Sequence, residues 1–133
     1  MSIQFKKYRL ERSENFDEFM KELGVNFLVR KMANTVTSTV QLVKEGENSY
    51  SFNTVSTFRN QTLKFNLNEE FEEERMDGKK VKCVVTFEGN KMIQHQLGDK
   101  SVRIEREFND DELITKCIVG NVVATRWFKA VSE

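Results

Sequence analysis

The sequence of 133 residues has no proline, a single histidine and only two cysteines, and these shortages exclude several classes of protein. Cys83 and Cys117 lack the CxxC spacing of zinc or redox motifs, so we expect free, buried thiols rather than a disulfide. His95 has no second histidine or cysteine nearby in the sequence, which argues against a metal site and against a catalytic residue. We expect no cofactor and no enzyme activity.

Neither sign of charge is in excess, because 21 Lys and Arg residues balance 21 Asp and Glu residues. A neutral chain has no long-range field to attract polyanions, so no nucleic-acid partner is expected. Long hydrophobic runs are also missing. The N-terminal stretch MSIQFKKYRLERSENF contains neither a signal peptide nor a membrane span. We therefore expect a cytoplasmic protein.

Eleven phenylalanines stand in this short chain, which is enough apolar material for a real core and argues against disorder. No linker or low-complexity tract appears, so 1–133 is expected to form one domain. Turn signals recur at intervals of roughly ten residues, between segments rich in Val, Phe, Thr and Ile, a spacing typical of an antiparallel all-β meander, sandwich or barrel. They stand at 45–48, 66–68, 76–78, 88–90, 97–100, 109–111 and 120–121.

One segment departs from the β pattern and predicts two short helices. Within 15–24, Asn15 is expected to cap the first helix, with Glu18 completing a capping box and Gly24 ending it. Its apolar face is expected to contain Phe16, Phe19, Met20 and Leu23. The second helix is expected to place Val25, Leu28, Val29 and Met32 on one face and Arg30 and Lys31 on the other.

Two short helices cannot cover the roughly ten strands that the turn signals predict, so the strands must mostly bury one another. Closure into a barrel removes the free edges of the sheet. A barrel of about ten strands is too wide for side chains alone to fill. The sequence therefore predicts a ten-stranded antiparallel up-and-down barrel with an internal cavity, capped at one end by a helix-turn-helix.

Two arginines fall in the apolar phase of late strands. Arg106 alternates in register with Val102, Ile104 and Phe108, and Arg126 lies in phase with Ala124, Phe128 and Ala130. Either these are surface arginines in a misread phase, or both point into the cavity. A buried guanidinium cannot lose its proton, so in the second case an external anion such as a carboxylate is the natural partner. An apolar cavity with a cationic anchor suits a fatty acid.

The sequence resembles the intracellular fatty-acid-binding proteins, in the heart, adipocyte and muscle-type branch that includes many invertebrate members. The segment KKYRLERSENFDEFMKELGV at 6–25 matches the N-terminal signature of that family. The segments STFRN at 56–60, EEFEEERMDGKKVK at 69–82, REF at 106–108 and NVVATRWFKA at 121–130 follow in the family's order. The resemblance covers the whole chain and implies a long-chain fatty acid as the ligand, bound without any reaction.

The resemblance also implies site residues. In this branch two arginines and a tyrosine hold the carboxylate; the arginines fall on Arg106 and Arg126, and the tyrosine position is Phe128, which lacks the hydroxyl. A water, Thr115, Gln94 or Gln96 could replace that hydrogen bond. Gln94 and Gln96 match inward polar positions, which leaves His95 outside. Further cavity and portal positions implied are Phe16, Met20, Val25, Phe58, Met76, Asp77, Lys79, Gln96, Ile104, Thr115 and Cys117.

Three basic positions of the helical segment, Lys21, Arg30 and Lys31, match residues through which some relatives contact membranes or nuclear import factors. They imply transient membrane contact by a monomer, with the nucleus as a second compartment; a merely solvated helix face is the alternative. Phe128 leaves a second reading open, a carrier of retinoids or another hydrophobic ligand. A cysteine-dependent enzyme on the same barrel would need a base beside Cys83 or Cys117.

Overall fold

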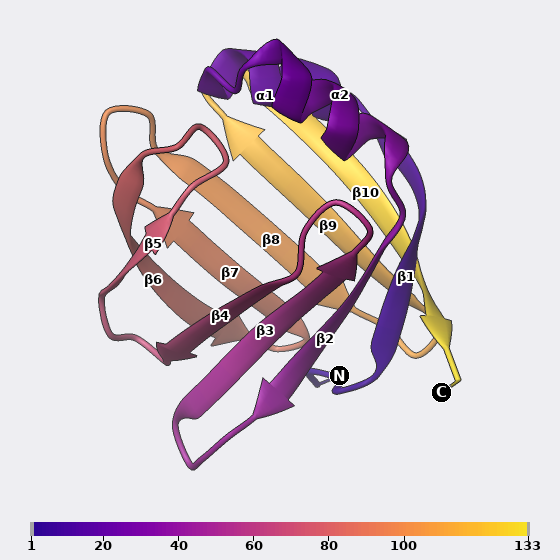
Figure 1. The fold of residues 1–133 in the computed structure, drawn as a ribbon. Helices are drawn as coiled ribbons and strands as arrows, with labels where there is room; N and C mark the ends of the chain where they lie inside the picture. The colour runs from indigo at the N-terminus through magenta and orange to yellow at the C-terminus, as the bar shows by residue number, and fades with distance from the viewer. Residues whose placement is uncertain (1, 133) are drawn as a thin grey trace.

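The computed structural model describes residues 2–132 and has ten strands and two helices, arranged as a barrel with a helical cap over one end (Figure 1). The helices are α1 (Phe16–Leu23) and α2 (Phe27–Thr35). The strands are β1 (Lys7–Glu14), β2 (Ser38–Lys44), β3 (Ser49–Ser56), β4 (Gln61–Asn66), β5 (Phe71–Glu74), β6 (Lys80–Glu88), β7 (Lys91–Gln96), β8 (Val102–Phe108), β9 (Glu112–Val119) and β10 (Val122–Val131).

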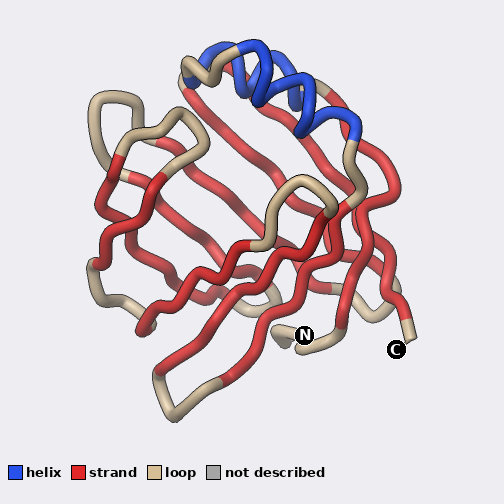
Figure 2. The backbone as a smooth tube through the Cα atoms, viewed as in Figure 1, coloured by secondary structure: helices blue, strands red, loops and turns tan. Residues whose placement is uncertain are grey.

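The strands form one antiparallel sheet in which neighbours in the sequence pair with each other, except β4 and β5, and β1 also pairs with β10. The order β4-β3-β2-β1-β10-β9-β8-β7-β6-β5 leaves β4 and β5 at the two edges, joined by the turn 67–70 but not paired. Figure 2 shows the strands joined by short loops at both ends of the barrel. The predicted ten-stranded antiparallel barrel with a helix-turn-helix cap is confirmed.

The turns fall where the sequence signals placed them, and glycine is required at the tightest ones. Gly78 and Gly120 have φ of 83° and 56°, a backbone conformation that costs other residues energy. A further turn at 57–60 carried no such signal. There the side chain of Ser56 accepts a hydrogen bond from the backbone N–H of Arg59 at 2.9 Å.

Helix α1 buries the four predicted apolar residues, and Gly24 ends it with φ of 94° and N–H bonds to the carbonyls of Met20 and Lys21. The predicted capping box is wrong. Asn15 stands at the N-cap but has a left-handed φ of 65° and makes no side-chain cap bond. Its amide instead donates to the carbonyl of Val123 at 3.1 Å, so the tertiary contact with β10 replaces the local cap.

The apolar face predicted for the second helix is also corrected. Asn26 caps α2 by accepting from the N–H of Val29 at 3.0 Å, so the helix begins later than predicted. Val29 and Ala33 pack against the buried cluster beneath the cap, whereas Leu28 and Met32 are 72% and 46% exposed. Because α2 lies over the barrel mouth, only one narrow side of it meets apolar surface. No helix among residues 2–132 could cross a membrane.

The core has two parts. One is centred on the end of the barrel away from the helices and contains Tyr8, Leu42, Met92, Phe108 and Leu113, all nearly inaccessible to solvent. The other joins α1 to the ends of β8, β9 and β10 near the cap. Between them lies the space in which the candidate site is found.

Candidate functional site

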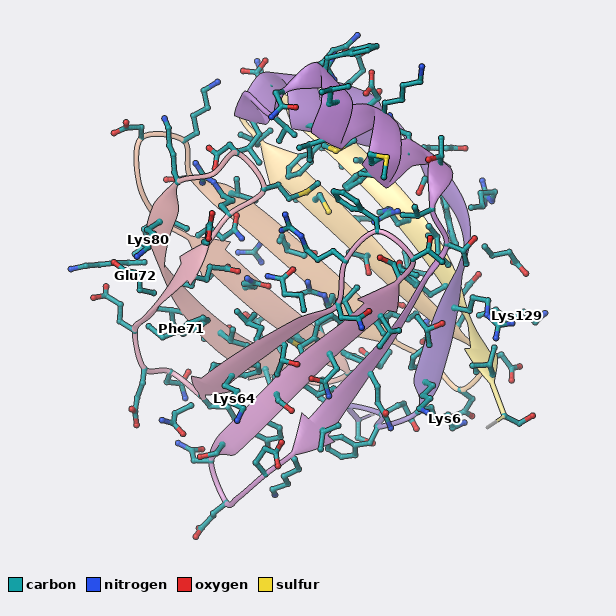
Figure 3. All side chains as sticks on the ribbon, viewed as in Figure 1. Lys6, Lys64, Phe71, Glu72, Lys80 and Lys129 are labelled. Carbon is teal, nitrogen blue, oxygen red and sulfur yellow. The ribbon has the colours of Figure 1, made fainter. Side chains whose placement is uncertain are left out.

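An internal cavity of about 240 Å³ lies between the helical cap and the closed end of the barrel. Its cap end is apolar, with Phe16, Phe19 and Leu23 from α1 and Val29 and Ala33 from α2. The wall beneath is polar and is made by side chains of strands on one side of the barrel. Figure 3 shows many side chains in the space between the helices and the strands. The polar wall contains Glu73, Gln94, Gln96, Arg106, Thr115 and Arg126.

Arg106 and Arg126 both line the cavity, so the surface reading of the two arginines is excluded. The register explains how they meet. Thr115 on β9 is the partner of Arg106 on β8 and also of Arg126 on β10. The three side chains therefore stand next to one another on the same face of three adjacent strands, with strand spacings of about 4.8 Å. Strands β8, β9 and β10 thus bring together three residues that lie about ten positions apart in the sequence.

Arg106 donates from Nη1 to Oε1 of Gln94 at 2.8 Å, and its guanidinium carbon lies 4.2 Å from the centre of the Phe52 ring. Burial lowers the pKa of Arg106, and attraction to the nearby Cys117 and Glu73 acts in the opposite direction. An arginine remains protonated even so. The cavity thus encloses a fixed positive charge that contacts an amide oxygen and an aromatic face.

Arg126 donates from Nε to the hydroxyl of Ser13 on β1 at 2.9 Å. Its guanidinium carbon lies 4.0 Å from the centre of the Phe16 ring and 5.8 Å from that of Phe128. Burial lowers its pKa as well. Among residues 2–132, neither Arg126 nor Arg106 forms a salt bridge with a carboxylate at 4 Å or less. Two guanidinium groups are therefore held in place by neutral partners and can accept an anion.

Most of the predicted cavity residues are lining residues in the structure. They are Phe16, Phe58, Met76, Gln96, Ile104, Thr115, Cys117 and Phe128, besides the two arginines. Phe58 does so from the turn after β3 rather than from the strand itself. His95 does not line the cavity, although Gln94 and Gln96 on either side of it do, which agrees with strand alternation.

Four predicted residues lie off the cavity lining. Met20 and Val25 are buried, but they pack into the cluster under α1 because they face the ends of the strands rather than the cavity. Asp77 is turned toward Arg75, whose Nη2 donates to it at 2.9 Å. Lys79, expected to face the cavity, is exposed on the turn after β5.

Of the charged residues that line the cavity without being exposed, the sequence analysis missed two, Glu73 and Arg75. Both line the cavity, at the end of β5 and in the turn after it. Arg75 is 5% exposed, holds Asp77 through two nitrogens and donates from Nη1 to the carbonyl of Lys100 at 2.7 Å. The run of acidic residues in EEFEEER hid the alternation of β5, because both faces carry glutamate.

The carboxylate of Glu73 is held by three donors from the neighbouring strands. Its Oε1 accepts from Nε2 of Gln94 at 2.6 Å, from Nε2 of Gln96 at 2.8 Å and from the thiol of Cys83 at 2.9 Å. Gln94 in turn accepts from Arg106, so one amide connects the carboxylate to the guanidinium. Hydrogen bonds thus link β5 to β8 through Gln94, and a separate one links Arg126 on β10 to Ser13 on β1.

Both cysteines are free and buried, as predicted. Burial, together with the hydrogen bond to the Glu73 carboxylate, raises the pKa of the Cys83 thiol strongly. Burial also raises the pKa of Cys117, although the two arginines pull it down. Both groups are therefore held as thiols, the unreactive form. Within residues 2–132 there is no cluster of three or more His, Cys, Asp or Glu residues that could hold a metal ion.

The three basic residues of the helical cap differ in their surroundings. Lys21 lies 3.5 Å from Asp17 and 3.6 Å from Glu18 on the exposed side of α1. Arg30 is mostly covered, because its side chain contacts Asp17 at 3.2 Å and donates to the carbonyl of Val25. Lys31 is exposed, with its ammonium 5.9 Å from the centre of the Phe27 ring.

Comparison with known proteins identifies the family. Residues 7–130 match the model of the lipocalin / cytosolic fatty-acid binding protein family. A protein of Tyrophagus putrescentiae named fatty acid-binding protein is 50% identical over 123 residues, which cover 92% of this chain and 93% of that protein. The chain belongs to the lipocalin / cytosolic fatty-acid binding protein family.

Solved structures of fatty acid-binding proteins have the same barrel. The crystal structure of the fatty acid-binding protein in brain tissue of Drosophila melanogaster has a TM-score of 0.91 at 50% identity, covering 94% of this chain and 97% of that one. A Schistosoma mansoni fatty acid binding protein in complex with arachidonic acid has a TM-score of 0.91 at 38% identity, with 96% of each chain covered. The resemblance inferred from the sequence is therefore confirmed.

Proposed function

We propose that this chain reversibly binds a long-chain fatty acid in the cavity and carries it through the cytoplasm and the nucleus as a monomer, with residues 1–133 acting as one lipid-binding domain. The observation that carries the proposal is the pair Arg106 and Arg126 beside Thr115. They are two cations in an apolar cavity, both without an ion-pair partner among residues 2–132. A ligand with one carboxylate and a long apolar body satisfies both features.

The names of the relatives support this choice of ligand, since they include fatty acid-binding proteins and one complex with arachidonic acid. The carboxylate lies between the two guanidinium groups, with the hydroxyl of Thr115 as a further donor. Phe128 occupies the tyrosine position and contributes an apolar contact only. The hydrocarbon chain runs toward Ile104, Cys117 and Phe16 under the cap. No covalent step is involved, and the protein acts as a carrier rather than an enzyme.

The ligand passes between α2 and the turns 57–60 and 75–79, which we call the portal. Phe58 and Met76 line the cavity from these turns. Asp77 and Lys79 belong to the second turn, and Val25 lies between α1 and α2. Met20 fixes α1 from below. In this arrangement the fatty acid leaves when α2 separates from the turns, without unfolding of the barrel.

The test is a titration of delipidated protein with oleic acid, oleyl alcohol and retinol, repeated with Arg126→Ala and Arg106→Ala. Tight binding of the acid alone, lost by at least about tenfold in each variant, supports the carboxylate anchor. Equal binding of acid and alcohol, unchanged in the variants, contradicts it. That second outcome would favour a retinoid or another hydrophobic ligand, for which Phe128 is the one supporting residue.

The helical cap makes transient contact with anionic membranes through Lys21, Arg30 and Lys31. Support comes from the exposed apolar residues beside them on α2, namely Phe27, Leu28 and Met32. The transfer rate of a fluorescent fatty acid to vesicles should rise with anionic lipid content, and Lys31→Gln should reduce that rise. Lys129→Gln removes the same charge from β10, away from the cap (Figure 3). Equal transfer to neutral and anionic vesicles would contradict membrane contact.

A further inference from the structure

The charged side chains that line the cavity are not all of one sign. They are Arg59, Glu73, Glu74, Arg75, Arg106 and Arg126. Arg59 and Glu74 are exposed and their opposite charges are screened by solvent. Arg75 is neutralised by its buried pair with Asp77. The enclosed charges are therefore Arg106, Arg126 and the carboxylate of Glu73.

Glu73 is fixed in the wall and cannot turn away from the ligand. Its three donors come from two neighbouring strands, and all of them act on Oε1. Oε2 accepts no side-chain hydrogen bond from residues 2–132, and Glu73 lines the cavity. Oε1 is thus hydrogen-bonded to the protein, whereas Oε2 is available to a group in the cavity.

Gln94 connects this carboxylate to the anion site. Its amide oxygen accepts from Arg106 at 2.8 Å, and its amide nitrogen donates to Glu73 at 2.6 Å. Burial lowers the pKa of Arg106, and attraction to Cys117 and, to a smaller extent, to Glu73 acts against that lowering. A charge that acts on Arg106 will also act on an anion bound to Arg106.

We propose that Glu73 is a specificity-determining residue that restricts the cavity to ligands with a single negative charge. With Glu73, the enclosed charge is plus one, which a monoanion neutralises. A second negative charge on the same head group exceeds this net charge and is repelled by Glu73 in a cavity of low dielectric constant. The accepted class is therefore fatty acids and other single-charge amphiphiles, and the excluded class includes phosphate monoesters. This inference rests on the proposed function.

The test uses two ligands of equal chain length. Hexadecyl sulfate carries one negative charge at all working pH values, whereas hexadecyl phosphate gains its second charge near pH 6 to 7. The measured quantity is the ratio of their dissociation constants at pH 5 and at pH 8, from calorimetric titration. Any change in the charge of the protein itself between the two pH values affects both ligands and largely cancels in the ratio.

In the unmodified chain the ratio of phosphate to sulfate dissociation constants should rise by about tenfold between pH 5 and pH 8. Glu73→Gln keeps the size of the side chain and an oxygen for the three donors, and in this variant the ratio should stay level or fall. Glu72→Gln is the matched control, since it removes the same charge from the exposed neighbour, which is labelled outside the barrel in Figure 3. It should behave like the unmodified chain.

Moving the negative charge from position 73 to position 96 distinguishes an effect of the charge from a purely structural role of Glu73. The double variant Glu73→Gln, Gln96→Glu returns a carboxylate to the hydrogen-bonded partner 2.8 Å away and should restore the rise in the ratio. If Glu73→Gln leaves the ratio unchanged, the inference is overturned. The proposed function still stands in that case, provided that hexadecyl sulfate and oleic acid bind tightly and Arg126→Ala weakens both. If neither ligand binds, both proposals fail.

Discussion

Replacing Arg75 with methionine should destabilise the barrel more than any single change at an exposed charge. Arg75 and Asp77 are each 3% exposed in their side chains and share two hydrogen bonds, of 3.2 and 2.9 Å. Arg75→Met leaves the Asp77 carboxylate buried without its partner and also removes the bond to the carbonyl of Lys100. Removing one member of a buried ion pair costs about 3–5 kcal/mol.

For a chain of this length, that cost corresponds to a melting temperature lower by roughly 12–20 °C. Urea unfolding followed by the fluorescence of Trp127 measures the free energy directly. A double-mutant cycle with Asp77→Asn gives the part that belongs to the pair. The double variant should be more stable than the sum of the two single losses predicts, by at least about 1 kcal/mol. A loss below about 1 kcal/mol for Arg75→Met would refute the reasoning.

The stability that the Arg75–Asp77 pair contributes changes with pH in a definite direction. Burial raises the pKa of Asp77, but the hydrogen bonds from Arg75 and from the N–H of Lys79 outweigh it, so the pKa lies below the ordinary value. The unfolded chain then binds the proton more readily than the folded one. The contribution of Asp77 is complete above the unfolded pKa and is lost as the pH falls through the folded pKa. The decrease in the free energy of unfolding at low pH should be smaller in Asp77→Asn than in the unmodified chain.

Three further predictions concern buried polar groups. Phe128→Tyr should tighten oleic acid binding about tenfold or more, because a hydroxyl bonded to a charged group contributes about 1.5–3 kcal/mol; unchanged affinity in calorimetry would show that the hydroxyl does not reach the carboxylate. Cys83 and Cys117 should react with iodoacetamide at pH 8 at least about a hundredfold more slowly than in urea, since both are buried with raised pKa values, and rapid labelling of the native chain would contradict this. Burial and the nearby Asp110 raise the pKa of Tyr8 to about 12, so the ultraviolet titration should show a step above the ordinary tyrosine range, and Tyr8→Phe should remove that step.

The strands and the helical cap were predictable because each depends on a local pattern. Alternation placed Arg106 and Arg126 on the inward face, and the register then added Thr115 between them. The ends of the elements were less predictable. Asn15 carries the right side chain for an N-cap, yet a carbonyl of β10 competes for its amide. A contact between residues far apart in the sequence overrides such a local preference.

The polar residues of β5 and the turn after it could not be read from the chain in the same way. In Glu72, Glu73 and Glu74 the inward and outward positions carry the same residue, so alternation gives no contrast. Only the hydrogen bonds from Gln94 and Gln96 on β7 show that Glu73 points into the interior. Likewise, Arg75 can be buried because its guanidinium donates hydrogen bonds to the carboxylate of Asp77 and to the backbone carbonyl of Lys100. Partners that come close only in the folded chain cannot be recognised from the amino-acid sequence around these residues.

The pairing of β1 with β10 has a consequence for how the molecule forms. Lys7 is the register partner of Val131, so the barrel closes through a contact between segments separated by almost the whole chain. Contacts of this kind slow folding, because a long loop must be ordered before the contact is made. Arg126 meets Ser13 across that same pair of strands. During synthesis on the ribosome, the proposed anion site therefore cannot exist until β10 has emerged, and binding of the proposed ligand should appear together with closure as the last event of folding.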